Sequence, residues 1–206
     1  MALAKSDRNI SAGESLRVSA LFVGLMAVAI LLAEKTDRVL FYKILYTART
    51  TMILFTPAMC LYILPGASRK KENYWRWFWT LSFLSYAIHL YYSFFIFFHG
   101  SLHEFFADQG AFVATINLII TIWWLFDMLM VWFHPAPARW IHVQRTGIQV
   151  FLAGTFFMST VVLHAVDDKE PFVIVWGVVQ AAAILICWLI RVRTFRTEQK
   201  TKEVFK

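Results

Sequence analysis

Four ionisable side chains lie within or at the edge of long apolar stretches of this sequence. They are Arg49, His89, Asp127 and His164. An ionisable group is costly inside a lipid bilayer unless it meets a partner or serves a function. Each of the four is therefore a candidate site residue, and each could equally serve the fold through a satisfied hydrogen bond.

The two histidines suggest a heme. A neutral imidazole nitrogen binds heme iron axially, and the pocket around such a heme must be apolar. His89 and His164 lie at similar depths when counted from the basic residues before them, but not when counted from the opposite boundary. The many Phe and Trp side chains nearby would suit a porphyrin or lipid. The pair is therefore a candidate set of axial iron ligands for a heme.

Arg49 is predicted to lie near the depth of His89, where its guanidinium could bind a heme propionate. Asp127 is the protein carboxylate that could compete for Arg49, but it lies about 10 Å deeper by helix rise. We therefore expect Asp127 to accept a hydrogen bond from a Trp, Thr or Asn on a neighbouring helix, or to be protonated by burial. Asn117 is the second polar residue in the same apolar stretch.

Two further arrangements involve His103. It follows His89 by fourteen residues, nearly four helical turns, a spacing that would suit a second heme. Gly100 lies between them and predicts that the helix ends first, which would leave His103 in a loop. Alternatively, His99, His103 and His164 could hold a small metal ion, although their spacing matches no recognisable ligand pattern.

The elements that must position these residues are apolar helices. The chain of 206 residues is 59% hydrophobic with a mean hydropathy of +0.58, more than a soluble domain of this size could bury. Apolar stretches of about 20 residues are long enough to cross a bilayer. The sequence thus predicts an all-α, polytopic membrane protein. Its single domain has six transmembrane helices, at about 18–33, 40–64, 77–99, 111–133, 147–166 and 171–190, with 191–206 as a basic cytoplasmic tail.

The positions of the Lys and Arg residues predict the orientation of this bundle. Fifteen of the 20 fall on the side that carries both termini, and five fall on the other side. By the positive-inside rule this predicts an inner-membrane protein whose N- and C-termini are both cytoplasmic. Because the basic residues flank apolar spans, the excess charge is interpreted as topology, and nucleic acid is not an expected partner.

Parts of the chain resemble a known family. The run Tyr46-Thr-Ala-Arg49-Thr50, the following apolar residues with Pro57, a basic loop and then LSFLSYAIHLYY resemble spans two and three of the ferric reductase-like transmembrane domain. The nearest resemblance is to the heme-binding membrane subunits of bacterial periplasmic methionine sulfoxide reductases. VVLHAV around His164 resembles the distal ligand segment of that family. The resemblance implies heme b on His89 and His164, and electron transfer across the membrane.

The sequence departs from that family at Phe151, where a second histidine would support two hemes, so one heme is expected. The chain also shows no flavin or nicotinamide domain, and electrons would come from quinol or from a membrane or periplasmic protein partner. Two other functions stay open. One is a non-catalytic subunit of a membrane complex without a cofactor. The other is a small-molecule transporter that uses Asp127, although neither broken helices nor internal repeats are evident.

Overall fold

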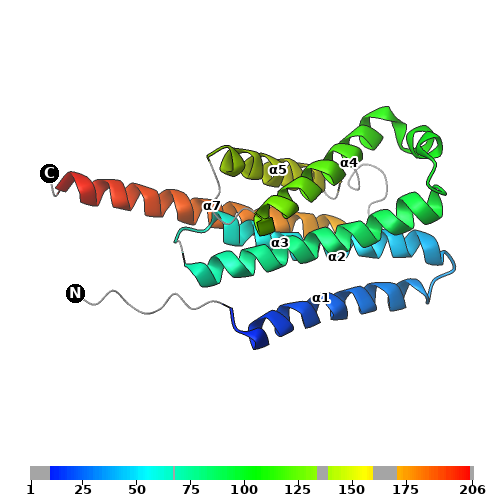
Figure 1. The fold of residues 1–206 in the computed structure, drawn as a ribbon, viewed down its shortest axis with the longest axis horizontal. Coiled ribbons are helices and arrows are strands. Elements are labelled where there is room, and N and C mark those ends of the chain that lie inside the picture. The colour runs from blue at the N-terminus through cyan, green and yellow to red at the C-terminus, as the bar shows by residue number, and fades with distance from the viewer. Residues whose placement is uncertain (1–9, 67, 134–138, 160–170, 205–206) are drawn as a thin grey trace.

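The computed structural model describes residues 10–66, 68–133, 139–159 and 171–204, and every regular element in these ranges is a helix (Figure 1). Five helical stretches within them are long and apolar enough to cross a membrane. The all-helical class is thereby confirmed, and a multi-pass membrane protein is supported. In chain order the elements are α1 (Ala12–Ala33), α2 (Val39–Ile63), α3 (Arg69–Leu90), the π-helix η1 (Tyr91–Phe97), α4 (Leu102–Phe133), α5 (Arg139–Phe157) and α7 (Pro171–Val204).

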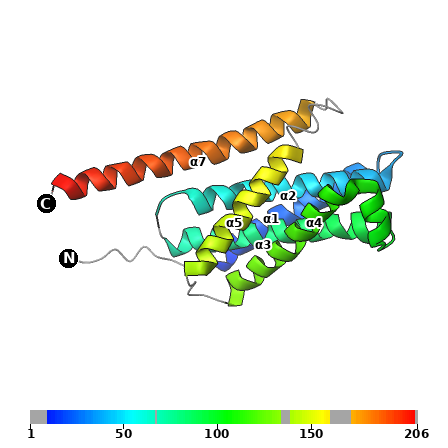
Figure 2. The ribbon, with the colours of Figure 1, turned by 90° about the horizontal axis from the view of Figure 1, so that it is seen from above.

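The five candidate spans are α1, α2, α3 together with η1, α4, and most of α7. The helices α1, α2 and α3 run side by side, and α2 packs against both of the others. Helices α4 and α5 cross this group obliquely (Figure 2), and α7 packs against α2 and α5. The first residue of α1 and the last residue of α7 lie at the same end of the bundle in both views.

The distribution of side chains is inverted relative to that of a soluble protein. Large apolar side chains face outward, among them Leu16, Phe112 and Ile122, which are 70%, 78% and 69% exposed. Polar side chains, including Thr47 and Ser82, are fully buried between the helices. In a bilayer the outer surface contacts hydrocarbon, and polar groups must find partners inside the protein. This arrangement therefore fits a bilayer environment.

Aromatic side chains form the centre of the bundle. Trp79 and Trp124, from α3 and α4, are fully buried with ring centres 5.2 Å apart, and Phe55 of α2 packs edge-on against Trp124 at 6.2 Å. Rings of this size contribute large buried areas in addition to favourable edge-to-face contacts. A large part of the aromatic content noted in the sequence thus fills the protein core.

Four helices begin several residues earlier than predicted, α1 at Ala12 and α4 at Leu102 among them. The third helix begins at Arg69, not near residue 77, because the Ser68 side chain accepts a hydrogen bond from the Lys71 backbone N–H at 3.1 Å. The predicted link His134–Thr146 was also wrong in its second half, since α5 begins at Arg139. Residues 139–146 contain neither Pro nor Gly, so nothing in their sequence opposes a helix.

The predicted link Gly100–Gly110 is helical for most of its length. The Ser101 side chain accepts a hydrogen bond from the Glu104 backbone N–H at 3.2 Å, which starts the helix at Leu102. His103 is therefore an exposed helical residue, and its assignment to a loop was wrong. Gly100, with a φ of 72°, does separate this helix from η1 as predicted. At the other end, the predicted tail continues as a helix to Val204.

Candidate functional site

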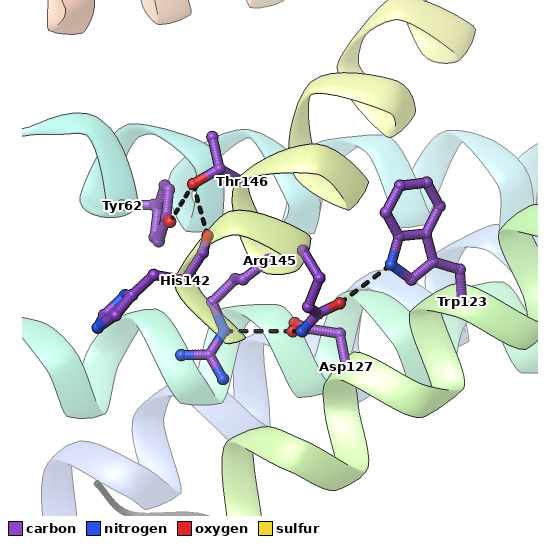
Figure 3. Close-up of polar contacts among 7 residues, drawn as sticks. Tyr62, Trp123, Asp127, His142, Arg145 and Thr146 are labelled. Carbon is purple, nitrogen blue, oxygen red and sulfur yellow. Dashed lines mark hydrogen bonds and ion pairs between the residues drawn. The ribbon is translucent and has the colours of Figure 1, made fainter. Parts of the chain in front are cut away.

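An ion pair is buried where α4 meets α5. The carboxylate oxygen Oδ1 of Asp127 accepts hydrogen bonds from Arg145 Nε at 3.2 Å and from Gln144 Nε2 at 2.5 Å (Figure 3). The Asp127 and Arg145 side chains are 0% and 7% exposed. Gln144 in turn accepts a hydrogen bond from Trp123 Nε1 at 3.0 Å. Because Trp123 and Asp127 are one turn apart on α4, this network fixes the register of α4 against α5.

The Arg145 guanidinium also contacts α3. Its Cζ lies 4.9 Å from the ring centre of Trp75, within the range of a cation–π interaction. The charge is thus held between a carboxylate and an aromatic face. Asp127 Oδ2 and Arg145 Nη2 have no hydrogen-bond partner within the part of the chain that the structure describes. The arrangement joins three helices and suits a structural clamp.

Asp127 accepts from two residues that the sequence analysis did not name. A Trp, Thr or Asn donor, or protonation by burial, was expected, and the hydrogen bonds to Oδ1 come from Gln144 and Arg145. Both lie in the segment that was assigned to a link, so neither was considered as a bundle residue. A signal was present, because the buried residues of α5 include Ile141, Arg145, Ile148 and Leu152. Their spacing of three and four residues marks one helix face, and Arg145 lies on it.

A second contact ties α5 to α2. The hydroxyl groups of Tyr62 and Thr146 lie 2.7 Å apart, and Thr146 also donates to the backbone carbonyl of His142 at 2.9 Å (Figure 3). Both hydroxyl groups therefore have partners at the end of the bundle where α2 finishes.

His89 belongs to a regular set of hydrogen bonds between α3 and α2. Ser82 Oγ donates to the Thr51 carbonyl at 3.1 Å, and Ser85 Oγ donates to the Thr47 carbonyl at 3.3 Å. His89 Nδ1 lies 2.9 Å from the Ile44 carbonyl. The donors are three and four residues apart on one face of α3. We name these three side chains the α3 polar stripe.

The contact with Ile44 fixes the tautomer of His89. A carbonyl oxygen only accepts, so Nδ1 carries the proton and Nε2 keeps a free lone pair. An Nδ1–H bond to a backbone carbonyl is the usual support of a metal-ligating histidine. The π-helix η1 begins two residues later, at Tyr91, and such segments frequently mark functional sites. The orientation of His89 is therefore compatible with binding a metal through Nε2, and its Nδ1–H hydrogen bond also contributes to the packing of α3 against α2.

The structure also describes two of the other predicted site residues, Arg49 and Asn117. Arg49 lies on α2, with its guanidinium 5.4 Å from the ring centre of Tyr46. Asn117 donates to Gln109 at 2.8 Å. His164 lies outside the described residues.

Among the described residues, His99 and His103 belong to no candidate metal centre, while His164 lies outside the described part of the chain. His99 Nδ1 lies 3.3 Å from Glu104 Oε2, and both side chains are exposed. Within residues 10–66, 68–133, 139–159 and 171–204, no group of three or more His, Cys, Asp or Glu side chains could hold a metal ion. This absence does not test a heme at His89, because heme iron would need only one protein ligand, His89 itself, from the described residues.

A cavity of about 690 Å³ lies between α2, α5 and α7. Sequence reasoning did not find it, because it depends on how α7 packs. The lining is mainly apolar but includes two buried glutamines, Gln149 and Gln180. His89 is not part of this lining, so the cavity and the α3 polar stripe are separate features.

Comparison with known proteins assigns no relative. No family model matches the chain, and neither the curated proteins nor the solved structures include a significant match. The resemblance to the ferric reductase-like domain therefore stays a prediction from the residues around Arg49, His89 and His164.

Proposed function

We propose that this protein is an integral membrane electron-transfer protein that holds one b-type heme on His89. The observation that carries the proposal is the hydrogen bond between His89 Nδ1 and the Ile44 carbonyl at 2.9 Å. It orients the imidazole and leaves Nε2 for iron. The adjoining π-helix, Tyr91–Phe97, adds support because it alters the backbone immediately after the ligand.

The second axial ligand in this proposal is His164, on the strength of the sequence alone. Arg49 stays the proposed contact of a heme propionate, likewise on the strength of the sequence alone. The heme would supply a one-electron couple, and the apolar surroundings would help to set its potential. The electron donor and acceptor would be quinol or a membrane or periplasmic protein partner.

A reduced-minus-oxidised visible spectrum of the purified protein tests the proposal. The protein should be produced with heme supplied and shown to be folded. We expect a b-type α-band in the wild type, and its loss in His89→Ala and His164→Ala. His142→Ala is the matched control and should keep the band, because the proposal gives this helix α5 histidine no role.

His89→Asn separates the ligand role from the structural role. Asparagine can keep a side-chain N–H near the position of Nδ1, and so can still donate to the Ile44 carbonyl, but it cannot ligate iron through Nε2. We expect a folded protein without an α-band. A folded, heme-supplied wild type without the band, or an unchanged band in His89→Asn, would refute the proposal.

The α3 polar stripe supports a second candidate function, that of a subunit of a membrane complex. His89 is the third member of an evenly spaced set that begins with Ser82 and Ser85, so a purely structural role accounts for its hydrogen bond equally well. In that case the protein would be a subunit of a membrane complex without a cofactor. Absence of the α-band together with a stability loss in His89→Ala, rescued by His89→Asn, is the result expected of this candidate.

The proposed location is the inner membrane, with six spans and both termini cytoplasmic. Support comes from the distribution of Lys and Arg and from the common end of the bundle at which α1 begins and α7 finishes. Labelling of single cysteines in a Cys60→Ser, Cys187→Ser background tests this. A membrane-impermeant maleimide should label Ser101→Cys from the periplasm and should label Glu198→Cys only after the membrane is opened.

A further inference from the structure

The cavity between α2, α5 and α7 has room because small residues face it. Ala153 and Gly154 of α5 and Gly177 and Ala181 of α7 are among its lining residues. Its volume of about 690 Å³ falls within the range of about 300–1,000 Å³ that small-molecule sites occupy. The remaining lining is mostly apolar, including Ile63, Val150, Phe157 and Ile184. Space of this kind, next to lipid, suits a molecule with a long hydrocarbon part.

Two glutamine side chains line this apolar space, and amide atoms of both have no hydrogen-bond partner among the described residues. Gln149 is 0% exposed, and neither its Nε2 nor its Oε1 has a hydrogen-bond partner among the residues that the structure describes. Gln180 is 4% exposed, and its Nε2 is likewise without a partner in that part of the chain. A buried amide without a partner is unfavourable. These atoms are therefore available to a ligand that supplies two acceptors and one donor.

Arg191 lines this cavity and, together with Lys71, an adjoining one. Both side chains donate to backbone carbonyls at the end of α2, Arg191 to Ile63 and Lys71 to Leu64. Arg191 follows Gln180 by eleven residues, about 16 Å along the axis of α7. Arg191 is thus too distant to pair with a head group that contacts Gln180. Around Gln149 and Gln180 the lining is uncharged.

We propose that this cavity binds an acylglycerol, a neutral lipid whose head group has an ester carbonyl and hydroxyl groups. Gln149 and Gln180 would donate to two lipid oxygens through their Nε2 atoms, and Gln149 Oε1 would accept from a lipid hydroxyl. The acyl chain would lie against the apolar lining. This site does not depend on the heme proposal, because His89 is not part of its lining.

Photo-crosslinking tests the site in a bilayer. The wild-type protein in phosphatidylcholine liposomes is irradiated with a monoacylglycerol that carries a diazirine in its acyl chain, and the labelled peptides are mapped by mass spectrometry. We expect labels on α5 and α7 around Val150 and Leu185. Excess 1-monooleoylglycerol should compete, whereas oleate and 1-oleoylglycerol-3-phosphate should not. Labels spread evenly over the lipid-facing helices, or competition by the two anions, would overturn the proposal.

The variants Gln149→Leu and Gln180→Leu show whether the amides bind the lipid. Each should reduce the labelling at the site about tenfold, as expected for a lost hydrogen bond. Gln109→Leu, outside the cavity, is the control and should label like the wild type. A second readout is the thermal unfolding midpoint without added lipid. Gln149→Leu should keep or raise it, because leucine removes unpartnered polar atoms. Unchanged labelling, or a lowered midpoint for Gln149→Leu, would instead mean that the glutamines serve the fold.

Discussion

Asp127 and Arg145 form an ion pair between α4 and α5 in which both side chains are almost completely buried. Neither hydrocarbon nor water can compensate one charge if the other is removed. The cation–π contact of Arg145 with Trp75 adds α3 to the same junction. This junction, rather than the histidines, is the most constrained polar feature of the described residues.

Asp127→Asn should destabilise the protein strongly, because it leaves the Arg145 cation buried without a counter-charge. Breaking a buried pair in this way costs about 3–5 kcal/mol. Arg145→Met removes the cation but can still pack on Trp75. The double variant Asp127→Asn, Arg145→Met should therefore lose less stability than the sum of the losses in the two single variants. Unfolding in detergent, followed by tryptophan fluorescence for both single variants and the double variant, measures this coupling.

The surface ion pair of Arg76 and Glu72 supplies the control for this comparison of single and double variants. Glu72 is about half exposed, and Glu72→Gln should change stability by no more than about 1 kcal/mol. Equal losses in Asp127→Asn and Glu72→Gln, or strictly additive losses across the Asp127–Arg145 cycle, would contradict a role of the buried pair as a clamp.

The α3 polar stripe should contribute small, separate amounts of stability. Ser82→Ala and Ser85→Ala each remove one hydrogen bond between helices, and such bonds in membrane proteins are worth about 0.6 kcal/mol on average. Ser93→Ala, whose hydroxyl group donates within its own helical segment to Leu90, should have a smaller effect. Denaturant titration of the three variants in one detergent measures the differences. Identical effects would show that the contact between α2 and α3 gains nothing from these hydroxyl groups.

The sequence predicted where the helices lie in the chain better than it predicted the contacts between them. Apolar stretches of about 20 residues define membrane spans through length and composition alone, so the six predicted spans include all five candidate spans of the structure, with errors at their ends. The errors arose at 12–17, 69–76, 102–110 and 139–146, where charged residues suggested loops although the local sequence allows a helix. Arg145 was missed for this reason. Gln149 and Gln180 were missed because their significance depends on how α5 and α7 pack, which composition does not reveal.

Gly147 should not tolerate a bulky side chain, because α5 approaches Trp123 so closely there that even a Cβ atom would be crowded. A Cβ atom at Gly147 would lie 3.1 Å from Trp123 Cζ2, and Trp123 is the residue that donates to Gln144. Gly147→Val should therefore lower stability by about 1–3 kcal/mol through overpacking. Gly24→Val is the control, since nothing lies within 4 Å of its Cβ position, and it should stay within about 0.5 kcal/mol of the wild type. Similar unfolding curves for the two variants would contradict the close approach.

Gly110 should be irreplaceable for a different reason, the conformation of its own backbone. It has φ 75° and ψ 152° at the kink in α4, a region that residues with a Cβ enter at a cost of about 1–3 kcal/mol. Gly110→Ala should lower stability by that amount although nothing lies within 4 Å of its Cβ position. Gly13→Ala, in the first turn of helix α1, should be neutral or slightly stabilising, because alanine favours a helix more than glycine does. Thermal unfolding of the two variants distinguishes strain from crowding, and a neutral Gly110→Ala would show that α4 can run straight through this position.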